Sequence, residues 1–181
     1  MSALALTLDQ PRDRLGFKGP RAAEWLVTNG IVLPMLPNTW TRSQGADGAG
    51  PLLVARLGST EFFIEDAAAG TALKRITGAG DELAAGVYPV LREDWALELC
   101  GTGVHDVLAQ VCNVNFAALI LDSRPVIMTL MIGVAVLVVP DGGTAERRYR
   151  IWCDPTFGPY LSESLGAVVG ECGGRIMGVP G

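Results

Sequence analysis

A glycine-rich turn is the segment of this sequence closest to a cofactor-binding motif. It reads Gly101-Thr102-Gly103-Val104-His105-Asp106 and stands between a predicted strand and a predicted helix. That order of elements is typical of dinucleotide-binding proteins, in which glycine amides approach the pyrophosphate. Asp106, however, stands where the third glycine of such a fingerprint belongs. The glycines are equally well explained by a tight strand-to-helix turn that has no room for a side chain.

Acid–base chemistry at neutral pH favours histidine, and the chain has one, His105. Its neighbour Asp106 cannot usefully face it, because consecutive residues of a helix point apart. His105 is therefore either a general base or, more commonly for a lone histidine, a surface or helix-packing residue. Asp154 precedes Pro155, and this pair favours a helix cap over a catalytic carboxylate. We assign no catalytic or cofactor-binding residue.

The cysteines have no spacing that predicts a metal site. There are four of them, without a CxxC pair and without a second histidine to complete a ligand set: Cys100, Cys112, Cys153 and Cys172. In a reducing compartment disulfides are also disfavoured. We therefore expect buried thiols and no metal.

The composition is unusually apolar for a soluble domain. Of 181 residues, 49% are hydrophobic and 18% charged, against about 25% charged in typical soluble domains. The net charge of −5 and a pI near 4.8 argue against a nucleic-acid partner. The surplus of apolar residues favours surface hidden in an assembly. A well-packed monomer rich in alanine and glycine is the alternative.

The N-terminal residues 1–8 have no basic start, long apolar core or cleavage site, so no signal peptide is predicted and a cytoplasmic location is expected. The apolar stretch 125–140 is too short to span a membrane. It contains Gly133 and many Val and Ile residues. We interpret it as a buried central strand or as a strand pair bent at Gly133.

The elements that would position these residues are predicted to occur twice. A strand, a glycine turn and a helix occur at 15–26 and again at 97–108, with Gly19 aligned to Gly101. The segments 52–57 and 61–65 are predicted to form a hairpin around Gly58-Ser59. The segment 61–66 then leads into a helix much as 148–154 does. We therefore predict an α+β fold made of duplicated β-α-β-β-α, ferredoxin-like halves in one compact domain, residues 1–181. The halves run about 12–90 and 91–174, with helices covering one side of the sheets.

One long loop is predicted from Pro34 to Pro51, because it is rich in proline and glycine and lacks apolar periodicity. Loops of this length are often functional. Trp40, flanked by Pro37 and Asn38, is either an anchor for a partner or a lid over the chain's own core. We name these three residues as an expected interface.

Several short motifs, made of turns and strand edges, are distributed over nearly the whole chain. They are Arg14-Leu15-Gly16-Phe17-Lys18-Gly19-Pro20 with Ala22, Ala23 and Trp25; Pro37-Asn38; Arg56-Leu57-Gly58 with Glu61-Phe62; Asp94-Trp95 with Leu97, Leu99 and Gly101; and Ile151 to Tyr160. Together they resemble the gamma subunit of heterotetrameric sarcosine oxidase and the corresponding small, delta-type subunit of N-methylglutamate dehydrogenase. The motifs do not separate the two, although the Lys18-Gly19-Pro20 turn favours the dehydrogenase.

The resemblance implies a fold related to the aminomethyltransferase (glycine-cleavage T protein) family, in a subunit that carries no flavin. It implies larger flavin- and folate-binding partner subunits and a small zinc-binding one, which together hold FAD, FMN, NAD, tetrahydrofolate and zinc. The implied reaction is oxidative demethylation of a secondary amino acid, with the methyl carbon captured on folate or released as formaldehyde.

This chain is shorter than a full T protein and has no acidic residue that matches the folate-activating one. We therefore transfer no catalytic residue and expect a non-catalytic subunit of an oxidoreductase complex. A free-standing folate-binding or aminomethyl-transfer protein is the alternative.

Overall fold

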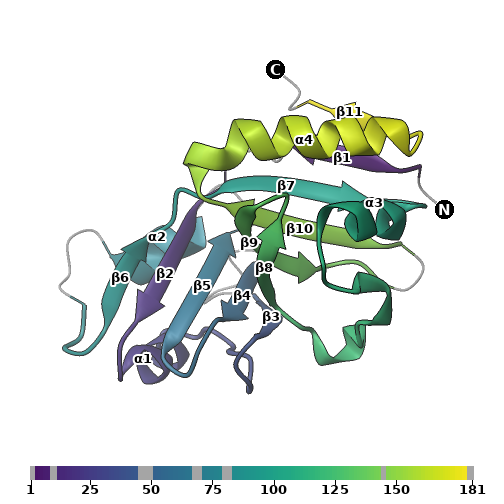
Figure 1. Cartoon of the computed structure of the whole chain (residues 1–181). Coiled ribbons are helices and arrows are strands. Elements are labelled where there is room, and N and C mark those ends of the chain that lie inside the picture. The colour runs from purple at the N-terminus through teal and green to yellow at the C-terminus, as the bar shows by residue number, and fades with distance from the viewer. Residues whose placement is uncertain are drawn as a thin grey trace. The chain divides into compact units, whose positions relative to one another are not determined.

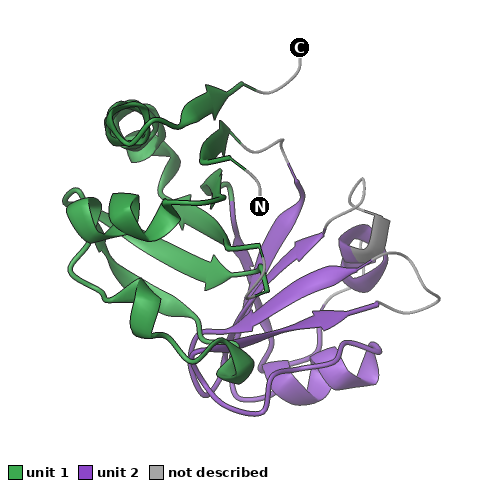
Figure 2. Cartoon of the chain, turned by 90° about the vertical axis from the view of Figure 1, so that its right-hand side faces the viewer, with its two compact units in different colours: residues 1–11, 93–181 green, residues 12–92 purple. Residues whose placement is uncertain are grey.

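A computed structural model of the chain describes residues 3–8, 12–44, 51–66, 71–78, 83–143 and 146–178. The described residues form an α+β structure with two sheets and four α-helices (Figure 1). The chain divides into two compact units, residues 12–92 and residues 1–11 together with 93–181 (Figure 2). Each unit contains one sheet, and the expectation of a single compact domain stays a prediction.

The unit of residues 12–92 contains a five-stranded antiparallel sheet in the order β3-β4-β5-β2-β6. Its elements are β2 (Arg14–Lys18), α1 (Ala22–Thr28), β3 (Thr39–Ser43), β4 (Leu52–Arg56), β5 (Glu61–Asp66), α2 (Thr71–Thr77) and β6 (Tyr88–Leu91). Phe17, Phe62 and Ile64 on the strands pack with Leu26 of α1 and Leu73 of α2 in one apolar cluster. Both helices therefore cover the same face of the sheet.

The unit of residues 1–11 and 93–181 contains a six-stranded sheet in the order β11-β1-β7-β10-β9-β8. Its elements are β1 (Ala5–Leu8), β7 (Trp95–Cys100), α3 (Val104–Val111), short 3-10 turns at Phe116–Ala118, Leu121–Ser123 and Pro155–Phe157, β8 (Ile127–Met131), β9 (Val134–Pro140), β10 (Arg148–Cys153), α4 (Gly158–Glu171) and β11 (Arg175–Met177). β1 and β11 are parallel, and the other neighbours are antiparallel. Leu108 of α3 and Leu165 of α4 pack on Leu99 and Ile151, so again the helices share one face.

The two halves have the same register, and they exchange their first strands. β5 pairs Glu61 with Lys18, and β10 pairs Arg148 with Cys100 at the equivalent place. β1 precedes β2 in the chain but pairs with β7, whereas β6 precedes β7 but pairs with β2. Each half is therefore β-β-α-β-β-β-α rather than β-α-β-β-α, with its first strand in the other sheet.

Elements with strong local signals lie where the sequence predicts them. The hairpin around Gly58-Ser59 joins β4 and β5, and the apolar stretch is a strand pair that turns at Ile132-Gly133. The Asp154 carboxylate accepts a hydrogen bond from the Thr156 amide at 2.8 Å, which begins the turn that leads into α4. These elements follow from turn and cap chemistry.

The prediction of one loop from Pro34 to Pro51 is wrong, because Thr39–Ser43 forms the edge strand β3 paired with β4. Residues 45–50 of that prediction lie outside the described residues. The short strands β1, β6 and β11 were also not predicted. All three are hydrogen-bonded to strands distant in the sequence, and β6 and β11 lie at sheet edges. Local sequence pattern does not reveal such pairing.

Candidate functional site

The side chains of His105, Tyr149 and Arg147 form a polar cluster in the unit that contains α3 and β10. His105 lies in the first turn of α3, and its Nε2 is 2.7 Å from the Tyr149 hydroxyl and 3.0 Å from Nη1 of Arg147. Phe116 packs edge-on against the Tyr149 ring. The cluster therefore ties the start of α3 to the start of β10.

The hydrogen bonds determine the protonation state of His105. A guanidinium group only donates, so Nε2 must accept the bond from Arg147 and the neutral imidazole carries its proton on Nδ1. Burial and the nearby Arg147 charge lower the pKa of His105, against an opposing effect of Asp106. Burial likewise raises the pKa of the Tyr149 hydroxyl. Both groups are therefore neutral near pH 7.

This arrangement opposes general-base catalysis by His105. The lone pair of its basic nitrogen is already engaged by Arg147 and lies 2.7 Å from the Tyr149 hydroxyl, and a proton taken up there would lie beside the positive charge of Arg147. Of the two interpretations of the lone histidine, the structure favours the helix-packing one.

The space beside Gly101, in the glycine turn before α3, is filled by the backbone of Ala3 and Leu4. Gly101 has a φ of +101°, and a Cβ there would collide with the carbonyl oxygen of Ala3. β7 also has antiparallel neighbours on both sides, whereas dinucleotide fingerprints occur in parallel βαβ units. The tight-turn interpretation of Gly101 and Gly103 is therefore the one that fits.

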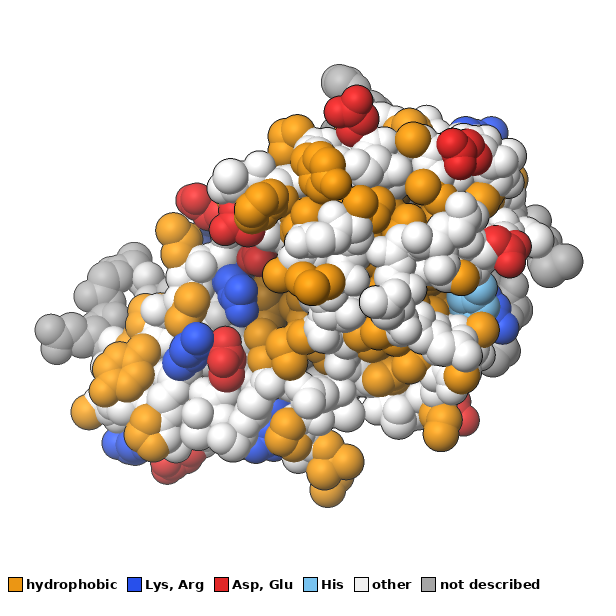
Figure 3. Space-filling view, viewed as in Figure 1, with side chains coloured by type: hydrophobic (Ala, Val, Ile, Leu, Met, Phe, Trp, Pro, Cys, Tyr) orange, Lys and Arg blue, Asp and Glu red, His pale blue; other side chains and the backbone are white. Residues whose placement is uncertain are grey.

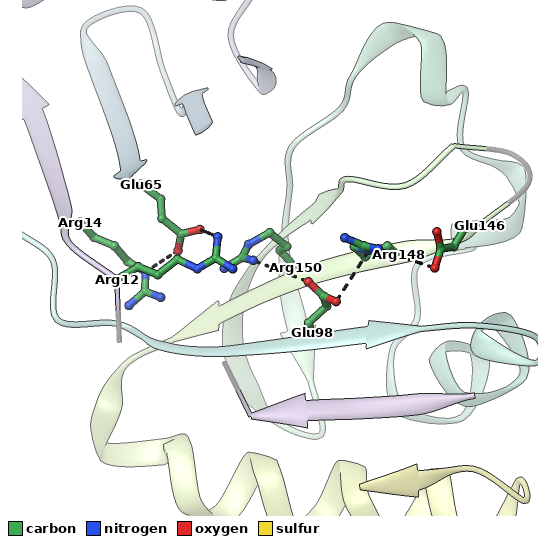
Figure 4. A network of polar contacts seen from close by, with 7 residues as sticks. All are labelled: Arg12, Arg14, Glu65, Glu98, Glu146, Arg148 and Arg150. Carbon is green, nitrogen blue, oxygen red and sulfur yellow. Dashed lines mark hydrogen bonds and ion pairs between the residues drawn. The ribbon is translucent and has the colours of Figure 1, made fainter. Parts of the chain in front are cut away.

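A buried ion-pair cluster lies on the helix-free face of the sheet in residues 12–92 (Figure 4). Nε of Arg14 donates to the Glu65 carboxylate at 2.6 Å, and Nη1 of Arg12 lies 3.8 Å from the same carboxylate. The side chains of Arg14 and Glu65 are 6% and 2% exposed. A pair so little hydrated depends on its geometry, because each charge has lost most of its water.

A second cluster lies on the helix-free face of the six-stranded sheet (Figure 4). The Glu98 carboxylate is 3.7 Å from Nε of Arg148 and 3.7 Å from Nη1 of Arg150, and Arg148 also approaches Glu146. Arg150 is almost fully buried. Neither cluster was found from the sequence. Arg148 and Arg150 alternate with the apolar Tyr149 and Ile151, and such alternation usually indicates that the charged side chains face solvent.

The residues expected to form an interface lie in two different environments. Pro37 and Asn38 are exposed and precede β3, where Asn38 has a φ of +56°. Trp40 lies on β3 and is 9% exposed, with the Arg42 guanidinium over its ring. The indole is therefore packed within the structure, although a role of these residues in assembly stays a prediction.

The cysteines are all free thiols, and among the described residues no group of His, Cys, Asp and Glu has the arrangement of a metal site. Burial raises the pKa of the Cys153 thiol to about 11, with smaller effects of Asp154 and Asp94. The raised pKa keeps this thiol protonated and unreactive at neutral pH.

Apolar side chains are exposed at many points of the face drawn in Figure 3. Over all described residues, the large apolar side chains that are more than half exposed include Met35, Leu36, Leu91, Ile120 and Leu130. Among the described residues no helix has the length and apolar character needed to cross a membrane.

Solved structures of the same fold include the following two. Aminomethyltransferase T of the glycine cleavage system from Bartonella henselae superposes with a TM-score of 0.71 and 18% identity over 98% of this chain. A chain of heterotetrameric sarcosine oxidase from Corynebacterium sp. U-96, solved with pyrrole 2-carboxylate, gives a TM-score of 0.65 and 20% identity over 92% of this chain. No family model matches the sequence, and no curated protein matches it.

The two neighbours differ in how much of them this chain represents. It spans 48% of the aminomethyltransferase chain and 83% of the sarcosine oxidase chain. The expected T-protein-like fold is confirmed by the two superpositions, and the chain spans about half the length of the aminomethyltransferase.

Proposed function

We propose that this chain is a non-catalytic subunit of a heteromeric flavoenzyme that oxidatively demethylates a secondary amino acid, sarcosine or N-methylglutamate, with folate as the one-carbon acceptor. The observation that carries the proposal is the shared fold with a chain of similar length in a heterotetrameric sarcosine oxidase. In this assignment FAD, FMN, NAD, tetrahydrofolate and zinc belong to partner subunits.

The chemistry of the described residues agrees with a supporting role. The basic nitrogen of His105 is engaged by Arg147 and Tyr149, and burial keeps the Cys153 thiol protonated. The charged clusters around Glu65 and Glu98 pair strands within each sheet. Exposed apolar side chains supply surface for assembly.

The test is purification of the chain, tagged at its own locus, from the cells that produce it. We expect it to bring down larger subunits with a flavin absorption spectrum, which sarcosine or N-methylglutamate bleaches under anaerobic conditions. The substrate that bleaches the flavin distinguishes the two amino acids. A tagged chain that is purified without any flavoprotein would contradict the proposal.

The second candidate is a free-standing folate-binding or aminomethyl-transfer protein, which the fold match to aminomethyltransferase T favours. It predicts that the isolated chain binds tetrahydrofolate, as measured by titration calorimetry. The subunit proposal predicts no heat of binding in the same experiment.

A further inference from the structure

The segment between α1 and β3 presents large apolar side chains to solvent. We call residues 32–38 the apolar loop. Met35 is 90% exposed, Leu36 66% and Val32 57%. Ile31 and Pro34, by contrast, are buried, and Ile31 belongs to the cluster under α1. The loop is therefore anchored on the core and exposes its largest side chains at the tip.

The backbone of the apolar loop is held in place by the side chain of Arg56. Nη1 of Arg56 donates to the carbonyl oxygens of Pro34 at 3.3 Å and Met35 at 2.9 Å. Nε and Nη2 of the same guanidinium donate to Gly58 and Ser59 at 3.2 and 3.0 Å. One cation thus links the loop tip to the β4–β5 turn.

Further hydrogen bonds hold both ends of the loop. The amide of Val32 donates to the Ser43 hydroxyl at 3.0 Å, and the Thr39 hydroxyl donates to the Leu36 carbonyl at 2.6 Å. The Asn38 amide donates to the Arg56 carbonyl at 2.7 Å. A loop ordered in this way before contact loses little conformational entropy when a partner covers it.

The charge distribution restricts the kind of partner. No residue between Glu24 and Arg42 is charged, and the Arg56 guanidinium is directed at backbone carbonyls. A nucleic acid requires cations, and binding to an anionic membrane surface is strengthened by basic residues beside the apolar ones. An uncharged apolar surface of a protein fits the tip of the loop, because their contact would remove water from no charged group.

We propose that the apolar loop, through Met35 and Leu36, inserts into an uncharged apolar pocket of a larger subunit of the flavoenzyme complex, with Arg56 as the positioning residue. The inference rests on the proposed function and names the contact surface within it. It names a contact separate from the expected interface of Trp40, Pro37 and Asn38, through two side chains that are more exposed than the indole of Trp40.

The test compares two matched double variants in the tagged complex purified from its own cells. Met35→Ser with Leu36→Ser removes the tip. Met128→Ser with Leu130→Ser removes a Met and a Leu that are 54% and 61% exposed on β8. The amount of flavoprotein recovered per tagged chain is measured by absorbance, and thermal melting of each isolated chain checks the fold.

We expect the tip variant to reduce flavoprotein recovery about ten-fold or more with an unchanged melt, and the β8 variant to retain it. Arg56→Gln should give an intermediate loss, because the apolar side chains remain but their backbone is released. Full recovery with the tip variant, or equal loss with both pairs, would overturn the loop assignment while leaving the proposed function intact.

Two further outcomes would also overturn the inference. If the wild-type chain recovers no flavoprotein, the proposed function fails and the loop assignment fails with it. If the wild-type chain is a dimer by light scattering and the tip variant is a monomer, the occupant of the loop surface is a second copy rather than a flavoprotein subunit.

Discussion

Gly19 and Gly101 occupy the same position in the two halves of the chain. Gly19 follows β2 and Gly101 follows β7, in the turn that leads from the strand into the next helix. Their φ values are +123° and +101°. A Cβ on Gly19 would collide with the Gly86 carbonyl oxygen, and one on Gly101 with the Ala3 carbonyl oxygen. Gly86 and Ala3 each lead into one of the exchanged strands, β6 and β1. The turn and the strand exchange are thus repeated together.

A glycine-to-alanine series separates backbone strain from collision. Gly19→Ala and Gly101→Ala should each destabilise the chain by about 3 kcal/mol, since they combine both effects. Gly133→Ala, at a φ of +79° in open space, should cost about 1 kcal/mol. Gly143→Ala, with neither constraint, is the neutral control. Denaturant unfolding measures all four, and a large loss at only one of Gly19 and Gly101, or no loss at either, would refute the equivalence of the two turns.

Strand β1 should stabilise the unit that contains β7. It does so although the residues that follow β1 in the chain, 12–92, form the other unit. Leu6 of β1 is fully buried in the apolar cluster of the unit that contains β7, so Leu6→Ala should cost about 2–5 kcal/mol. Hydrogen exchange should increase first in β7 and β11, which pair with β1. Thr7→Ala, on the opposite face of β1, is the control. Faster exchange in β2 before β7 would contradict the observed pairing.

Removal of Arg14 should be more costly than removal of the whole pair it forms with Glu65. Arg14→Met leaves a buried carboxylate without its closest cation and should cost about 3–5 kcal/mol, with Glu65→Gln as the other single variant. Arg14→Met combined with Glu65→Gln removes both charges and should recover a large part of that loss. A double-mutant cycle in denaturant measures the coupling between the two residues. Additive effects would mean that the pair contributes nothing beyond its separate side chains.

Trp40→Ala should lower the stability of the isolated chain by about 3–5 kcal/mol, because the indole is buried on β3. Trp40→Phe, which keeps an aromatic ring, should lose less. Thermal melting of the isolated chain is the measurement. An unchanged melt with weakened assembly would favour the partner anchor over the lid, the two alternatives that the sequence left open for Trp40.

The sequence predicts elements whose signals are local. The Gly58-Ser59 turn, the Gly133 bend and the Asp154-Pro155 start each specify their own backbone geometry, and all three lie as predicted. β3 is not predicted, because it lies in a segment rich in proline and glycine, a composition that is typical of loops. β6 is mostly exposed and contains Pro89, which is tolerated at a sheet edge but weakens a strand pattern.

The polar clusters depend on distance in the fold rather than distance in the chain. Arg14 and Glu65 meet because β2 and β5 pair in one register. His105 meets Tyr149 only because the start of α3 lies against the start of β10. No spacing in the sequence reports either contact. The alternation of Arg148 and Arg150 with apolar residues suggests a solvated face, whereas the side chain of Arg150 is buried.

The pH dependence of stability should reflect the lowered pKa of His105. Between the ordinary value of 6.5 and the lower folded value, the unfolded chain binds a proton at this residue and the folded chain does not. Stability contributed by His105 is therefore fully present above the ordinary value, falls as the pH drops through that window, and is lost below the folded pKa. His105→Gln should flatten this part of the melting-temperature profile.

Because the chain has one histidine, a proton NMR titration of the tag-free protein reports His105 without ambiguity. Burial and the Arg147 charge are the two causes that lower its pKa, so Arg147→Gln should move the midpoint upward. Arg148→Gln removes the same charge one residue along, where the guanidinium approaches Glu98 on the opposite face of β10, and should move it less. A wild-type midpoint at or above 6.5, or equal shifts in the two variants, would mean that Arg147 does not hold His105 in its neutral form.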